Sequence, residues 1–120
     1  MAVPQQTKQD IVQGLLVTKQ KGHILEITLR FKGNNDEADE VAAKTTELSN
    51  EIDTLLGQII DEWLAQSRGD VASIKEANSN LQRSIRSIQN GVATAQKVVK
   101  AIGFIDDAIV IASKFASAVA

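Results

Sequence analysis

The sequence predicts a mainly α-helical protein: an antiparallel coiled-coil hairpin of two helices with a long C-terminal helix, preceded by a short N-terminal segment that contains a strand. Two observations predict this fold. Apolar residues recur every three or four positions across 36–66 and again across 71–102, which is the period of one helix face. Residues 23–31 instead alternate apolar and polar side chains, which is the period of a half-buried strand. The chain of 120 residues is expected to form a single domain.

Composition limits both the core and the chemistry. Hydrophobic residues make up 43% of the chain and charged residues 23%, as in a soluble globular protein, and only 3% are aromatic, which predicts an aliphatic core. Cysteine is absent, which excludes disulfides and thiolate sites. The first residues lack the apolar run of a secretory signal, so we expect a cytoplasmic protein. The net charge of −2 creates no field that attracts nucleic acid, and we expect no nucleic-acid partner.

The N-terminal segment, residues 1–33, is expected to place a strand at 23–31. Residues 10–19 fit either a short helix or a strand, and 20–22 could close a hairpin between the two. A two-stranded hairpin is barely stable alone, so we expect it to pack on the C-terminal helix, to pair with a second subunit, or both. The apolar face of the strand consists of Leu25, Ile27, Leu29 and Phe31.

The first long helix is predicted over 36–66. Asn34 can cap its N-terminus, with Glu37 three residues later as in a capping box, and the neighbouring acidic residues favour the positive end of the helix dipole. Residues 67–70 then form a turn. The apolar face of this helix consists of Val41, Leu48, Ile52, Leu55, Ile59 and Trp63.

The second helix is predicted over 71–118. Asn78 is a polar residue within its apolar stripe, and such a residue specifies the register between helices. Asn90-Gly91 could break the helix, since glycine costs about 1 kcal/mol relative to alanine in a helix interior. The apolar repeat continues in phase across these two residues, however, which favours one continuous helix. The stripe consists of Val71, Ile74, Leu81, Ile85, Ile88, Val92, Ala95, Val99 and Ile102.

The two helices are predicted to fold back on each other at 68–69, which gives an antiparallel hairpin over 36–100. In this alignment the apolar stripes face each other and acidic residues of the first helix meet basic residues of the second. Exposed ion pairs contribute only about 0–1 kcal/mol each, so we expect them to set register more than stability. The predicted pairs are Glu62 with Lys75, Glu51 with Arg86, Glu40 with Lys97 and Glu37 with Lys100.

Residues 101–120 extend past the hairpin in this alignment. They are apolar over most of the helix circumference and therefore need a cover. Asp106 and Asp107 lie on a narrow polar stripe and, like Asn78, are expected to set register or oligomeric state. Charged side chains near the middle make a bilayer span unfavourable. The residues expected to meet a partner are Ile102, Phe104, Ile105, Ile109, Ile111 and Phe115.

The sequence predicts no catalytic residue, no cofactor and no metal site. His23 is the only histidine, and it lacks the converging partners that a site needs. The acidic run at 36–40 lacks the alternating oxygen ligands of a calcium loop. The basic side chains between 83 and 100 could contact phosphates, but in the predicted hairpin they face acidic residues.

The leading hypothesis is a non-enzymatic, self-associating helical hairpin that acts as an assembly or adaptor module. Formation of a homo-oligomer, or a protein partner that covers 101–120, would bury the apolar faces of strand 23–31 and of the terminal helix. The alternative is a membrane-active protein, pore-forming or bilayer-associated, that uses the same terminal helix.

Overall fold

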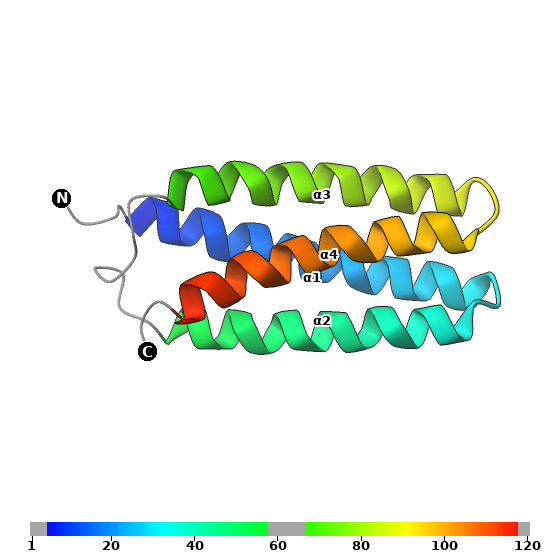
Figure 1. Ribbon diagram of the computed structural model, residues 1–120, viewed down its shortest axis with the longest axis horizontal. Helices are drawn as coiled ribbons and strands as arrows, with labels where there is room; N and C mark the ends of the chain where they lie inside the picture. Colours follow the sequence, from blue (N-terminus) through cyan, green and yellow to red (C-terminus); the bar gives the residue numbers. More distant parts are fainter. Residues whose placement is uncertain (1–4, 58–66, 118–120) are drawn as a thin grey trace.

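Four α-helices make up the part of the chain that the computed structural model describes, residues 5–57 and 67–117; the surroundings of side chains are described for 9–57 and 71–114. The helices are α1 (Gln5–Phe31), α2 (Asn35–Leu56), α3 (Ser67–Gln89) and α4 (Ala95–Ser117), and no strand occurs in these ranges. They lie roughly along one axis in a bundle measuring 49 × 21 × 17 Å (Figure 1). The prediction of a mainly helical chain is therefore confirmed.

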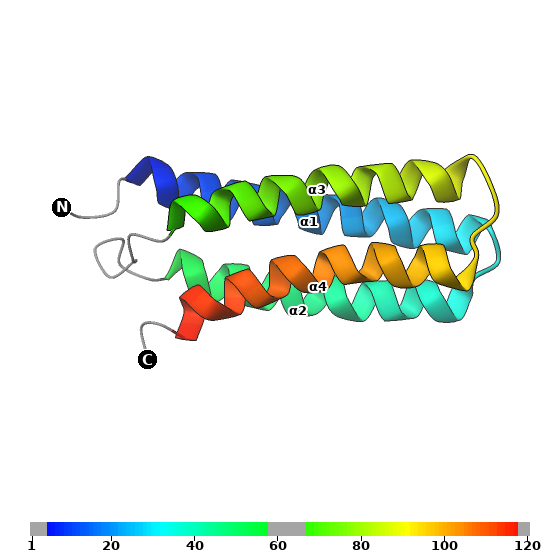
Figure 2. The same ribbon diagram turned by 45° about the horizontal axis from the view of Figure 1, so that its top comes forward.

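The bundle consists of two helical hairpins, α1–α2 and α3–α4, which lie side by side and turn at the same end (Figures 1 and 2). Within each hairpin the helices run antiparallel. Between the hairpins, α1 lies beside α3 and α2 lies beside α4, and the members of each of these pairs run parallel. As a result, α2 and α3 occupy opposite corners of the bundle.

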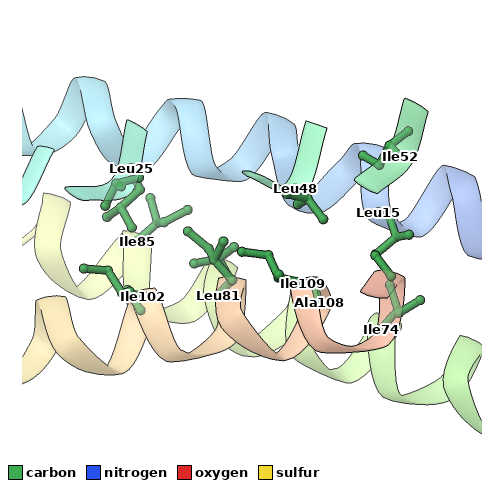
Figure 3. Packing of buried hydrophobic residues seen from close by; sticks show 14 of the residues in the cluster. Leu15, Leu25, Leu48, Ile52, Ile74, Leu81, Ile85, Ile102, Ala108 and Ile109 are labelled. Carbon is green, nitrogen blue, oxygen red and sulfur yellow. The ribbon is translucent and has the colours of Figure 1, made fainter. Parts of the chain in front are cut away.

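All four helices direct one apolar face into a common aliphatic core, whose central part is shown in Figure 3. Each helix contributes residues that are almost completely buried, as the three- and four-residue spacing of its apolar side chains requires. Among the largest are Leu15 and Leu25 from α1, Leu48 and Leu55 from α2, Ile74, Leu81 and Ile85 from α3, and Ile105 from α4.

The predicted strand at 23–31 is wrong, because these residues form the last part of α1. Leu25 and Leu29, four residues apart, face the core, whereas Ile27 and Phe31 are 55% and 88% exposed. The apparent two-residue alternation arose because the helix carries apolar residues on two faces, one buried and one exposed. Residues 10–19, which fitted either a helix or a strand, also belong to α1.

The end of α1 is fixed by Gly33, which has a φ of +81°. The backbone N–H of Gly33 donates to Arg30 O at 3.1 Å, and that of Asn34 donates to Leu29 O at 2.9 Å. This is the pattern with which a left-handed glycine ends a helix. Asn34 precedes α2 as expected, but its side chain makes no capping hydrogen bond; its amide Nδ2 lies 3.5 Å from Ala93 O in the other turn.

The predicted first helix begins where expected, but α2 ends at Leu56 instead of 66. Its predicted apolar positions from Val41 to Leu55 are buried. Ile59 and Trp63, and the predicted pair of Glu62 with Lys75, fall on residues outside the described part of the chain. The predicted turn at 67–70 is the first turn of α3.

The prediction of one continuous helix over 71–118 is wrong, because the chain reverses between Gln89 and Ala95. Thr94 begins the new helix: its carbonyl accepts from the N–H of Val98 at 3.1 Å, and its hydroxyl lies 3.3 Å from the N–H of Lys97. Two positions of the apolar repeat that was predicted to continue across this region are not buried: Val92 is 73% exposed and Val99 is 69% exposed.

The predicted pairing of 36–66 with 71–100 is also wrong, because α2 and α3 are diagonal and not adjacent. Both helices have the predicted apolar stripe, but an apolar stripe specifies only a face that seeks a core. In a bundle of four helices that core is shared, so the stripe does not identify the neighbour. Residues 101–117 do not overhang; they return alongside α3 and α2 within α4.

Candidate functional site

The ten apolar residues expected to form an interaction surface are separated by the fold. Ile27 and Phe31 alone among them are strongly exposed in the described part of the chain, and both lie on α1. Phe104 and Ile111 are partly buried against the core. Phe115 belongs to α4, but it follows residue 114, the last residue whose side-chain surroundings are described. The remaining five are buried in the core: Leu25, Leu29, Ile102, Ile105 and Ile109.

A line of exposed apolar side chains runs along α1 on the face opposite the core. Leu16 is 45% exposed and Ile24 is 40% exposed, and they continue toward Ile27 and Phe31 with helical spacing. We call these four residues the α1 outer stripe. Leu16 and Ile24 were not among the predicted contact residues, because 23–31 was predicted as a strand and 10–19 was left open between helix and strand. The three- and four-residue spacing of Ile24, Ile27 and Phe31 was the signal that could have identified Ile24.

Asn78 lies in the seam between α3 and α1 and is only 8% exposed. Its amide nitrogen donates to Gly14 O at 2.9 Å, and its carbonyl oxygen is within hydrogen-bonding distance of the Thr18 hydroxyl. The same hydroxyl lies 3.0 Å from Gly14 O. We call these three groups the buried polar cluster. Asn78 was expected in a helix seam, but its partner is α1 and not the first predicted helix.

Gly14 also allows α1 and α3 to approach closely. A Cβ atom at this position would lie 2.6 Å from Cγ2 of Ile74, which is buried. A larger residue would therefore push the two helices apart or displace Ile74. Close backbone approach and hydrogen bonding to Gly14 O occur at the same place, so they fix the same register.

Asp106 forms an ion pair with Lys44 of α2, with 2.8 Å between Lys44 Nζ and Asp106 Oδ1. The hydrogen bond and the charge of Asp106 raise the pKa of Lys44 above its ordinary value. Asp107 is exposed on the adjacent face of α4. The two aspartates therefore have different surroundings, and Asp106 joins α4 to α2 of the same chain.

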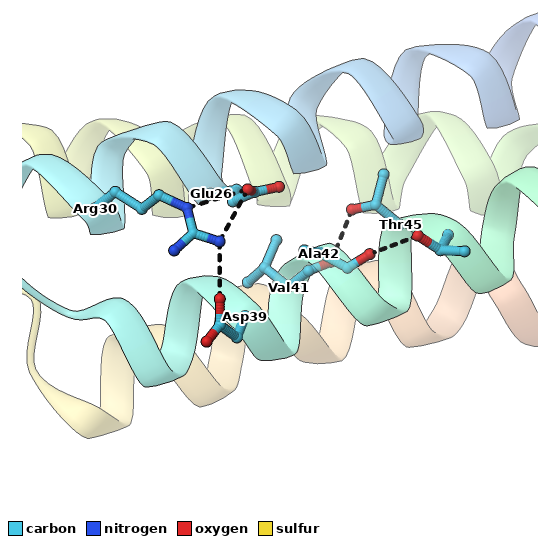
Figure 4. Close-up of polar contacts among 7 residues, drawn as sticks. Glu26, Arg30, Asp39, Val41, Ala42 and Thr45 are labelled. Carbon is cyan, nitrogen blue, oxygen red and sulfur yellow. Dashed lines mark hydrogen bonds and ion pairs between the residues drawn. The ribbon is translucent and has the colours of Figure 1, made fainter.

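A second set of ion pairs joins α1 to α2 near their turn (Figure 4). Arg30 Nη2 lies 2.8 Å from Asp39 Oδ1 and 3.2 Å from Glu26 Oε2. Hydrogen bonds to Asp39 and then Glu26 raise the pKa of Arg30. In the same view, Thr45 donates to Val41 O of its own helix at 2.8 Å. The guanidinium of Arg30 is thus neutralised by one acid of its own helix, Glu26, and by one acid of α2, Asp39.

The outer face between α3 and α4 is hollowed at two adjoining places, which together we call the α3–α4 groove. The first has a volume of about 250 Å³ and is basic, with Arg83, Lys97 and Lys100 around it. The second has a volume of about 440 Å³ and combines apolar side chains with Glu76 and Asp107. The two places share Asn80 and Phe104. The acidic residues that were expected opposite Lys97 and Lys100 lie on α2, which packs against α4 but not against α3, and none of them lines the groove.

Within the described residues, no three His, Cys, Asp or Glu side chains gather as a metal site would require. His23 is exposed on α1. No helix in the same part of the chain is long and apolar enough to cross a membrane.

Comparison with known proteins assigns no family: no family model, no curated protein and no solved structure matches this chain.

Proposed function

We propose that the protein is an assembly module that associates with a second copy of itself through the α1 outer stripe. The observation that carries this proposal is the exposure of Leu16, Ile24, Ile27 and Phe31 on one face of one helix. Burial of such a line of large apolar side chains between two copies is favourable at about 25 cal/mol per Å² of apolar surface removed from water. No catalytic role follows from the groups around it.

Of the two surfaces predicted to meet a partner, 23–31 and 101–120, the first lies on α1 and provides part of the proposed contact, whereas the second lies largely in the core. The core face of α4 packs against the other helices through Ile102, Ile105 and Ile109, so it is not available to a partner in this fold. A membrane-active role for this helix would require the buried residues of α4 to leave the core of the bundle. Among the predicted contact residues whose surroundings are described, Ile27 and Phe31 are strongly exposed.

The spacing of the stripe supports an antiparallel, two-fold contact. If Leu16 packs on Phe31 of the second copy, Ile27 lies opposite Gln20 and Ile24 lies opposite His23, so all four apolar residues fall within the contact, and Leu16 with Phe31 is its apolar pair. A two-fold contact uses the same patch on both copies and closes after two subunits. The stripe spans about 22 Å, at 1.5 Å per residue.

Disulfide trapping tests the geometry directly, because the chain contains no cysteine. Ile24→Cys lies beside the two-fold axis and should give a covalent dimer on mild oxidation. Leu16→Cys alone should not give a covalent dimer, since the two cysteines at position 16 lie far apart in the antiparallel contact. A mixture of Leu16→Cys with Phe31→Cys should form a disulfide between positions 16 and 31 of the two copies. Lys75→Cys, on the exposed face of α3, is the matched control that should remain monomeric.

Sedimentation at the highest attainable concentration tests the association itself. The substitution Ile27→Glu should dissociate the dimer without unfolding the bundle, because the side chain is 55% exposed. Val110→Glu changes an apolar residue of α4 that is somewhat more exposed, at 66%, and should leave the dimer intact. A wild-type protein that sediments as a monomer throughout, with no trapping at position 24, would contradict the proposal.

A further inference from the structure

We propose that the α3–α4 groove binds a phosphate monoester, with the phosphate at its basic part and the organic group on Phe104. The first observation is that the cations of this groove are uncompensated. In the described part of the chain, Arg83 and Lys100 make no ion pair, and the side chain of Lys97 makes a single hydrogen bond, from Nζ to Ser87 O at 3.4 Å. On the other side of the bundle, Arg30 and Lys44 have acidic partners.

The absence of acidic partners here follows from the topology. Arg83 lies on α3, which α2 does not pack against, and Lys97 and Lys100 lie on α4, where they line the groove together with residues of α3. Because α2 is diagonal to α3, the neighbours of Arg83 across the groove are Lys97 and Lys100 of α4. Three positive charges around one hollow repel one another, and an anion that enters it relieves that repulsion.

The other groups around the basic part suit a phosphate. The hydroxyls of Ser84 and Ser87 and the amide of Asn80 also line it, so neutral donors lie beside the cations. A phosphate group carries up to two charges and several acceptor oxygens, and it can engage the planar fork of arginine in two parallel hydrogen bonds. A carboxylate offers fewer acceptors to the same set of donors.

Phe104 indicates where the rest of the ligand lies. It lines both the basic part and the larger hollow, where Val110 and Ile111 add apolar surface. Glu76 and Asp107 line that same hollow and would repel a second anionic group. The groove therefore favours one phosphate followed by an apolar or aromatic group over a chain of phosphates that runs along its length.

The test is a titration of the isotopically labelled, intact protein followed by amide chemical shifts at constant ionic strength. Phenyl phosphate, inorganic phosphate and benzoate are the three probes. We expect saturable shifts concentrated at residues 80–87 and 97–104 with both phosphates. Phenyl phosphate should bind about three- to tenfold more tightly than inorganic phosphate, because its ring packs against that of Phe104.

Variants separate the two halves of the proposed site. Lys100→Gln and Arg83→Gln should weaken both phosphates several-fold, whereas Lys75→Gln, an exposed cation of α3 outside the groove, should change neither. Phe104→Leu keeps an apolar side chain against the core but removes the ring. It should abolish the advantage of phenyl phosphate and leave the affinity for inorganic phosphate unchanged.

Three outcomes would overturn the proposal. Shifts that do not saturate, or that spread over all cationic surfaces and persist in Lys100→Gln, would mean charge screening without a site. If benzoate bound as tightly as phenyl phosphate, the basic part of the groove would not be selective for a phosphate group over a carboxylate. An unchanged preference for phenyl phosphate in Phe104→Leu would reject the placement of the organic group. The α1 outer stripe takes no part in this test, so its result is independent of self-association.

Discussion

The two parallel seams of the bundle are held in register by different means. The α1–α3 seam contains the buried polar cluster and the close approach at Gly14. The α2–α4 seam has instead an ion pair at its rim, Lys44 with Asp106, whose side chains are 32% and 44% exposed. A buried polar group without its partner costs about 1–3 kcal/mol, whereas an exposed ion pair contributes about 0–1 kcal/mol. The α1–α3 seam therefore specifies the arrangement of the hairpins, and the α2–α4 seam only supports it.

The largest effect is expected when the buried polar cluster loses one member. Thr18→Val leaves the carbonyl oxygen of Asn78 buried without its donor, and should lower the free energy of unfolding by about 2 kcal/mol. Thr18→Val combined with Asn78→Leu removes both groups and should cost less than Thr18→Val alone. Urea denaturation measures both variants.

A matched threonine provides the control for that comparison. The hydroxyl of Thr46 donates only to Ala42 O of its own helix, at 3.0 Å, and is exposed. Thr46→Val should therefore change stability by no more than about 0.5 kcal/mol. If Thr18→Val were equally harmless, the buried cluster would not be what distinguishes the α1–α3 seam.

The next effect concerns the two glycines at 14 and 103. Gly14→Ala should lower the free energy of unfolding by about 1 kcal/mol, because contact with Ile74 outweighs the gain in helix propensity. At Gly103 a Cβ atom meets nothing within 4 Å, so Gly103→Ala should raise stability by about 1 kcal/mol. Thermal or urea unfolding gives both values.

Ile74→Leu removes the Cγ2 methyl that a Cβ at position 14 would meet, so it should restore part of the loss in Gly14→Ala. A gain in stability for Gly14→Ala equal to that for Gly103→Ala would show that the α1–α3 seam is not tightly packed at this point.

The smallest effect is expected at the rim of the α2–α4 seam. Asp106→Asn should cost no more than about 1 kcal/mol, and the loss should shrink as salt is added. Since Asp106 raises the pKa of Lys44, the stabilisation is complete below the pKa of lysine in the unfolded chain and is lost as the pH rises through the higher folded pKa. Urea titrations across the alkaline range should show a decline in the wild type that is weaker in Asp106→Asn.

Asp107→Asn serves as the control, because Asp107 makes no ion pair in the described residues. Equal alkaline profiles for wild type and Asp106→Asn would mean that the ion pair does not contribute to stability in solution.

The core faces of α2 and α3 could be predicted from sequence because each has one apolar stripe with an unambiguous period. Leu48 and Ile52 on α2 and Leu81 and Ile85 on α3 are buried as expected. Their neighbours could not be predicted, since the same stripe fits any helix around a shared core. Matching charges between the two helices then reinforced a pairing that the fold does not contain.

The predictions for the regions of α1 and α4 were wrong for two different physical reasons. In α1, β-branched residues and a second apolar face imitated the alternation of a strand. Between α3 and α4, the apolar repeat across Asn90-Gly91 concealed a turn after which Val98, and not Val99, faces the core. The position of Asn78 within a seam could be predicted from its place in the stripe, whereas the α3–α4 groove depends on which helices are neighbours and could not.

The separation of Thr18 and Asn78 in the chain has a consequence for the order of folding. They lie 60 residues apart, whereas each helical hairpin closes over a short turn. Contacts between distant residues form only after a large loss of loop entropy, so local contacts can assemble α1–α2 and α3–α4 before the hairpins dock. Hydrogen bonds that form only at docking stabilise the folded state more than the transition state for folding. Such bonds therefore lower the rate of unfolding and hardly change the rate of folding. We therefore expect loss of the buried polar cluster to speed the opening of the bundle and to leave the rate of its formation nearly unchanged.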